Sequence, residues 1–80
     1  MSAVGMTIFE YGMGAICDLT HATNYREVRK ILEDLLDQSD KLQQLHNDGN
    51  IMQEEFAFLN KHLLSVGTFA INRYFQLQEE

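Results

Sequence analysis

Residues 51–78 carry apolar side chains at alternating spacings of four and three residues, and this pattern restricts the fold more than any other feature of the chain. The alternation places one seam along an α-helix and is typical of helices that pack lengthwise against others. The seam consists of Met52, Phe56, Leu59, Leu63, Val66, Ala70, Arg73 and Leu77. A second apolar set lies beside it, formed by Phe58, Leu64, Phe69, Ile71, Tyr74 and Phe75. The predicted helix is therefore apolar over more than one face.

Residues 25–46 show a second helical stripe, which ends at a short polar break. Its apolar members are Val28, Ile31, Leu32, Leu35, Leu36, Leu42 and Leu45. Asn24 and Glu27 have the spacing of a capping box, which predicts a helix start at this point. Residues 46–50 contain Gly49 and Asn50, two residue types that tolerate a left-handed backbone and stop helices, and we expect Asn50 to cap the next helix. So short a turn predicts an antiparallel helical hairpin.

The N-terminal segment is predicted to form a short helix over residues 6–17. Its apolar residues recur at helical spacing and are Met6, Phe9, Met13 and Ile16. Gly12 and Gly14 weigh against a helix, and a short strand over residues 7–11 is the alternative, although no second strand is evident to pair with it. We interpret the stripe as a docking face rather than a membrane anchor, because it has no cationic flanks.

These patterns predict an all-α fold in a single helical domain covering residues 1–80: an antiparallel hairpin with a short N-terminal helix. A chain of 80 residues is close to the size at which one hydrophobic core is only marginally stabilising. One partner helix covers one stripe, so the extra apolar face of residues 51–78 must be covered by another element, another chain or a target. We expect assembly into a homodimeric or higher helical bundle, and a groove that binds a client protein is the alternative.

Composition excludes several classes of function. Six basic residues against twelve acidic ones give a net charge of −6, which argues against binding along a nucleic-acid lattice. The single cysteine excludes an internal disulfide and fits a cytoplasmic protein. No apolar run approaches the about 18 residues that a membrane span needs.

Sequence motifs for cofactors, metals or catalysis are also missing, so we expect no cofactor, no metal site and no enzyme activity. The chain contains no P-loop, no GxGxxG, no CxxC pair and no zinc-ligand spacing. Cys17, Asp18 and His21 come closest to a reactive or metal-ligating group, but their spacing alone shows no such arrangement, and we expect Cys17 to be an inert buried thiol.

Antiparallel pairing of the two long helices gathers basic and aromatic residues at the end remote from the turn. The candidate anion-binding residues are Tyr25, Arg26, Arg29, Lys30 and Arg73. Arginine presents a two-pronged donor to phosphate and tyrosine a stacking face, so one possible function is an oligomeric binder of a small phosphate-bearing ligand such as a nucleotide. Salt bridges within the fold are the competing interpretation of the same residues.

The function that the pattern favours is non-catalytic protein binding by an adaptor, inhibitor or chaperone-like regulator. It would act through the apolar helical surfaces of the oligomer, with another protein as the partner beside the chain itself. The candidate contact residues are Phe9, Met13, Phe58, Phe69, Tyr74 and Phe75.

Overall fold

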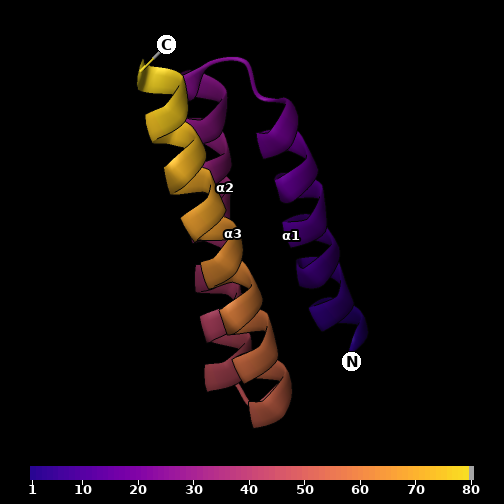
Figure 1. The fold of residues 1–80 in the computed structure, drawn as a ribbon. Coiled ribbons are helices and arrows are strands. Elements are labelled where there is room, and N and C mark those ends of the chain that lie inside the picture. Colours follow the sequence, from indigo (N-terminus) through magenta and orange to yellow (C-terminus); the bar gives the residue numbers. More distant parts are fainter. Residues whose placement is uncertain (80) are drawn as a thin grey trace.

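Three α-helices make up the part of the chain that the computed structural model describes, residues 1–79, with Glu79 described by its backbone alone. The helices are α1 (Ala3–His21), α2 (Tyr25–Asn47) and α3 (Gln53–Glu79). α1 and α3 run in one direction and α2 in the other, forming a rod of 44 × 18 × 15 Å (Figure 1). The predicted all-α fold is confirmed, and α2 and α3 form the expected hairpin. The predicted homodimer stays a prediction.

α1 is longer than the predicted segment 6–17, and the alternative strand over residues 7–11 is wrong because those residues lie inside this helix. Ser2 caps α1, since its hydroxyl oxygen accepts the N–H of Gly5 at 3.0 Å. The glycines do not break the helix because two of them face α3, where there is no room for a side chain. A Cβ at Gly5 would lie 2.9 Å from Cδ of Glu55, and one at Gly12 would collide with the His62 ring.

The predicted start of α2 and the turn after it are confirmed, but the predicted cap of α3 is wrong. The Asn24 side chain accepts the N–H groups of Arg26 and Glu27 at 3.0 and 3.1 Å. Gly49 has a φ of 74°, the left-handed conformation that glycine allows most readily. Asn50 donates its own N–H to the Leu45 carbonyl and so closes α2, whereas α3 begins three residues later, at Gln53.

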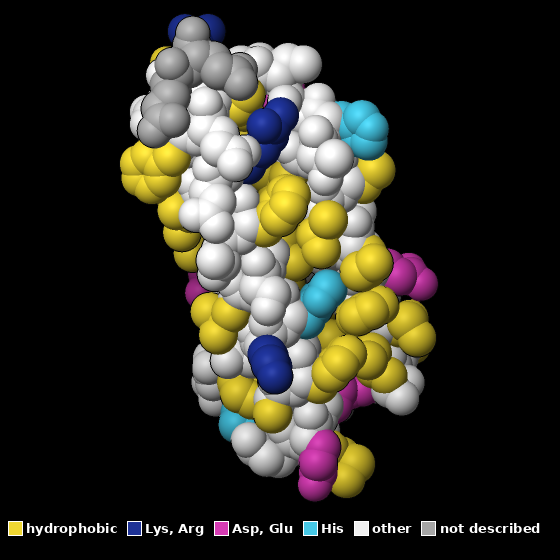
Figure 2. Space-filling model, viewed as in Figure 1, with side chains coloured by type: hydrophobic (Ala, Val, Ile, Leu, Met, Phe, Trp, Pro, Cys, Tyr) yellow, Lys and Arg dark blue, Asp and Glu magenta, His cyan; other side chains and the backbone are white. Residues whose placement is uncertain are grey.

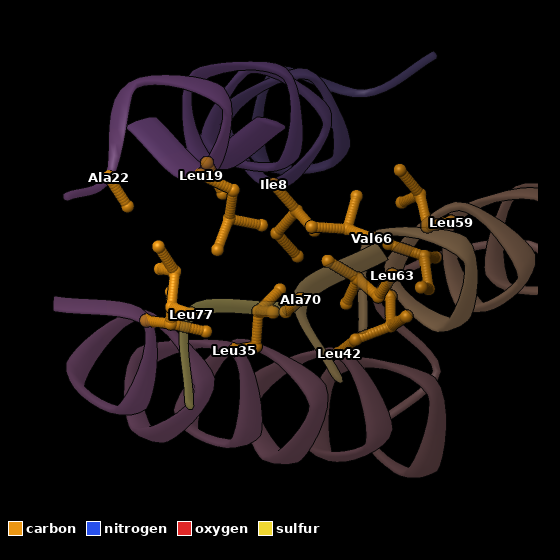
Figure 3. Close-up of a cluster of buried hydrophobic side chains, with 13 residues drawn as sticks. Ile8, Leu19, Ala22, Leu35, Leu42, Leu59, Leu63, Val66, Ala70 and Leu77 are labelled. Carbon is orange, nitrogen blue, oxygen red and sulfur yellow. The ribbon is translucent and has the colours of Figure 1, made fainter. Parts of the chain in front are cut away.

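A single apolar core runs between the three helices (Figure 3). Its buried members are Ile8, Ala15, Leu19, Ala22, Val28, Leu35, Leu42, Ile51, Leu59, Leu63, Val66, Ala70 and Leu77. The predicted seam is buried at Leu59, Leu63, Val66, Ala70 and Leu77, and half-buried at Phe56 and Arg73. Its first residue departs from the prediction, because Met52 is 73% exposed and its neighbour Ile51 enters the core instead.

The side of α1 that faces the core is not the stripe of large apolar residues. The buried residues of α1 are Gly5, Ile8, Gly12, Ala15 and Leu19. Met6 and Met13 remain exposed and Phe9 is half-buried. Gly5 and Gly12 thus bring α1 close to α3, Ile8 and Leu19 enter the core, and the predicted stripe of Met6, Phe9 and Met13 remains on the flank of α1.

Two glycines of α1 provide a matched pair of substitutions, because Gly12 packs against α3 and Gly14 is exposed. Gly12→Ala should lower the free energy of unfolding by about 1–3 kcal/mol, because the added methyl group overpacks the contact with His62, which a hydrogen bond to Phe9 holds in place. Gly14→Ala should raise it by about 0.5–1 kcal/mol, because nothing lies within 4 Å of the new Cβ and alanine favours the helix. Urea denaturation measures both values, and a stabilising Gly12→Ala would contradict the close approach.

Candidate functional site

Three polar side chains of α3 hold α1 in place along its length. At the start of α1, Glu55 accepts hydrogen bonds from the backbone N–H and the hydroxyl of Ser2. In the middle, Nε2 of His62 donates to the Phe9 carbonyl at 3.2 Å. At the end, Arg73 donates from Nε to the Leu19 carbonyl at 3.1 Å and from Nη2 to the Ala22 carbonyl at 2.9 Å.

The charges at the two ends of α1 match the helix dipole. A carboxylate lies at the N-terminus, where backbone N–H groups lack partners, and a guanidinium lies at the C-terminus, where carbonyls lack them. The backbone hydrogen bond from Ser2, followed by the bond from its hydroxyl, holds the pKa of Glu55 below its ordinary value. These contacts with α3 therefore fix the position of α1 and of the side chains beside its contact with α3.

We define the α1/α3 surface as Met6, Phe9, Met13, Phe58 and Phe69, the apolar residues that flank this contact. The ring of Phe9 stacks on the rings of Phe58 and His62, with centroids 5.8 and 4.6 Å apart. Met6 and Met13 share the flank of Phe9 by helical spacing, and Phe69 stands two turns beyond His62 on the same flank of α3. Met13 is 51% and Phe58 50% exposed. Figure 2 shows apolar side chains gathered over this face.

A hollow of about 460 Å³ opens at the turn end of the α1/α3 surface. Its lining is mainly apolar and includes Met1, Ile51, Met52 and Phe58, with Glu54 and Glu55 also among the lining residues. Phe58 belongs to both the hollow and the surface, so the two are continuous.

We define the α2/α3 surface as Leu36, Leu64, Ile71 and Phe75, on the flank of the hairpin away from α1. Leu64, Ile71 and Phe75 follow one another at helical spacing on α3. Leu36 stands one turn after Leu32, which lines a hollow of about 250 Å³ together with Arg29, Ile71, Tyr74 and Phe75. Leu36 is 67% and Leu64 65% exposed.

The six predicted contact residues do not form one surface. Phe9, Met13, Phe58 and Phe69 belong to the α1/α3 surface. Tyr74 and Phe75 line the hollow of the other flank. Met6, Leu36, Leu64 and Ile71 were not among the predicted contact residues. Met6 and Leu36 belong to stripes interpreted as docking or packing faces, whereas Leu64 and Ile71 belong to the extra apolar face of residues 51–78. The packing of all three helices decides which apolar residues remain exposed.

The five predicted anion-binding residues are divided as well. The Tyr25 ring packs edge-on against Tyr74, with centroids 5.9 Å apart, and the guanidinium carbon of Arg26 lies 6.0 Å from the Tyr25 centroid. Arg26, Arg29 and Lys30 line a hollow of about 380 Å³ with Glu33. Arg73 does not join them, because its guanidinium is directed to the α1 carbonyls. The predicted role of these residues stays a prediction.

Acidic residues surround the contact between α1 and α2. The pKa of Tyr11 is raised to about 12, mainly by burial and further by the nearby charges of Asp34, Asp18 and Asp37. Cys17 is exposed, so the prediction of a buried thiol is wrong: this residue faces away from the small residues that pack on α3. Its sulfur lies 3.9 Å from Nδ1 of His21, which is itself 2.9 Å from the Cys17 carbonyl oxygen.

Comparison with protein families, with curated proteins and with solved structures gave no match. Over the residues that the structure describes, no helix is both long and apolar enough to cross a lipid bilayer. The same residues include no group of three or more histidine, cysteine or acidic side chains placed to hold a metal ion.

Removing the Arg73 side-chain donors should loosen the end of α1. We expect Arg73→Met to lower the free energy of unfolding by about 2 kcal/mol, because two carbonyls lose a charged donor. Amide hydrogen exchange should accelerate near residues 18–23 and much less in α2. Lys61→Met, at an exposed cation of α3, is the control and should change neither quantity; unchanged exchange in Arg73→Met would contradict the assignment.

The pKa of Tyr11 tests the packing of α1 on α2. Asp34→Asn should lower this pKa from about 12 but leave it above 10, because burial is the larger cause. Since the unfolded value is near 10.0, the stability that Tyr11 contributes is complete below pH 10 and is lost as the pH rises toward 12. NMR titration of labelled tyrosine rings measures the pKa, with Asp40→Asn as a control that should leave it unchanged.

Proposed function

We propose that this chain is a small, non-catalytic protein-binding module, an adaptor, inhibitor or chaperone-like regulator, that works as a homo-oligomer in the cytoplasm. Its other partner is an amphipathic helix of a second protein, which lies along the α1/α3 surface. The cytoplasmic location is supported by composition, since a chain with a single cysteine forms no internal disulfide.

The placement of the methionines carries this proposal. Each of the four methionines of the chain is exposed, and none enters the core: Met1, Met6, Met13 and Met52. Methionine is flexible and polarizable, and it is used at surfaces that adapt to an apolar partner. Met6 and Met13 lie beside the stacked rings of Phe9 and Phe58, and Met1 and Met52 line the adjoining hollow.

The dimensions of the α1/α3 surface suit a helix. Phe58 and Phe69 are eleven residues apart on α3, which corresponds to about 16 Å along a helix axis. A partner helix of about three turns covers that length and presents apolar anchors at every third or fourth residue. The hollow beside Phe58, with a volume of about 460 Å³, accepts a large apolar side chain at one end of the contact.

The alternative function, binding of a small phosphate-bearing ligand, receives less support. The Arg73 guanidinium already donates to two carbonyls, so it is not directed toward Arg26, Arg29 and Lys30. The cationic part of such a site would then consist of neighbouring residues on the surface of α2 alone.

Site-specific photo-crosslinking tests the protein-binding proposal. A photoreactive phenylalanine analogue at Met13 should capture a protein other than this chain in source-cell extract, and the same analogue at Lys41 should not. With the captured protein purified, Met6→Ser combined with Met13→Ser should weaken binding about tenfold, because two partly exposed apolar side chains lose their burial in the complex. Circular dichroism confirms that the variant is folded.

Two outcomes would contradict the proposal. In one, the photoreactive analogue at Met13 captures only copies of this chain, or it captures the same proteins as the analogue at Lys41. In the other, the double serine variant binds the captured protein as tightly as the original chain.

A further inference from the structure

We propose that the α2/α3 surface binds the same surface of a second copy of this chain, with the two copies related by a two-fold axis and their α2 helices antiparallel. This inference rests on the proposed function, which includes self-association. It assigns self-association to the α2/α3 surface. The α1/α3 surface is left for the other protein.

The two apolar surfaces face in different directions on α3. His62 packs against α1, and Leu64 follows two residues later, about 200° around the helix axis. Leu64, Ile71 and Phe75 therefore lie on the flank that α1 cannot reach. A contact on this flank leaves Met6, Met13 and Phe58 free.

The α2/α3 surface combines a ridge and a hollow. The ring pairs Tyr25–Tyr74 and His46–Phe56 set the register of the hairpin and place Leu36 about level with Leu64. These two leucines form an exposed ridge at the middle of the rod. The hollow between Leu32 and Phe75 lies next to it. A two-fold contact joins one patch to itself, so both complementary shapes must be present on that patch.

Charge decides the relative direction of the two copies. Along the exposed side of α2, cations outnumber acids before Leu36, where Glu33 lies beside Arg26, Arg29 and Lys30. Acids outnumber cations after it, where Asp37 and Asp40 are followed by Lys41. A parallel arrangement would bring like charges together, whereas an antiparallel one brings opposite charges together.

One position of the two-fold axis fits the shape and pairs Arg29 with Asp40, at the cost of bringing the exposed Glu33 side chains of the two copies close to the axis. With the axis level with the midpoint between Leu32 and Leu36, each Leu36 lies opposite Leu32 of the other copy, at the edge of the hollow. Arg29 then lies opposite residue 39 of the other copy, within about one residue rise, 1.5 Å, of Asp40 along the axis. The contact therefore has two apolar insertions and two ion pairs, related by symmetry.

A charge-swap series tests this arrangement. Sedimentation equilibrium measures the dissociation constant of the dimer, and the unsubstituted chain should dimerise. Arg29→Asp and Asp40→Arg should each raise this constant about tenfold, since each substitution affects two ion pairs. The double variant should recover to within about threefold of the original, because it restores both pairs with reversed sign. Glu10→Lys, a charge reversal at an exposed residue of α1, should leave the dimer unchanged.

A second variant does not depend on charge. Leu36→Glu should yield a monomer that keeps its helical circular dichroism spectrum, because Leu36 is exposed in the isolated chain. The serine variant at Met6 and Met13 should remain dimeric. A monomeric original chain, a double charge variant that fails to recover, or dissociation by the methionine variant would overturn the inference.

The two proposals fail separately. If the charge-swap series behaves as expected but Met13 captures no other protein, the proposed partner surface is wrong and the dimer stands. If Met13 captures a partner while Leu36→Glu leaves the dimer intact, the dimer surface is wrong and the protein-binding function stands.

Discussion

The contact between α1 and α3 is the interaction on which the rest of the structure depends. Gly5 and Gly12 let the two helices approach closely, and Glu55, His62 and Arg73 bind backbone groups along α1. Without α1, residues such as Ile8 and Leu19 would be missing from the core, and the seam residues of α3 that they cover would be exposed. The position of α1 also determines which apolar side chains stay on the surface. The α1/α3 surface is thus a consequence of this contact, and the α2/α3 surface is the flank of the hairpin that α1 leaves uncovered.

Much of the fold follows from periodicity and turn chemistry. The seam through Leu59, Leu63, Val66 and Ala70 is buried as its spacing predicts, and the break at Gly49 joins two antiparallel helices. These features depend on residues close in sequence, so they can be recognised in one amino-acid sequence without a structure.

Two of the errors arose where a residue depends on a distant partner. Gly12 weighs against a helix when considered alone, yet it provides the space that His62 occupies. Arg73 was expected to join a basic cluster, but the free carbonyls at the end of α1 hold its guanidinium. The spacing of residues along the chain predicts neither pairing, because the partners are about fifty residues apart. The angle between α1 and α3 decides which side of one helix packs against which side of the other. For the same reason, the sequence did not predict that the six contact residues would be divided between two surfaces.

The central claim is that the α2/α3 surface forms the dimer and the α1/α3 surface stays free. An NMR dilution series on the unsubstituted chain tests this claim most directly, because it shows which amide signals shift as the dimer dissociates. Across the concentration range in which the dimer dissociates, NMR signals of Leu36, Leu64, Ile71 and Phe75 should shift, and those of Met6, Met13 and Phe58 should stay in place. Shifts confined to the methionine-bearing flank, or no concentration dependence at all, would contradict the account.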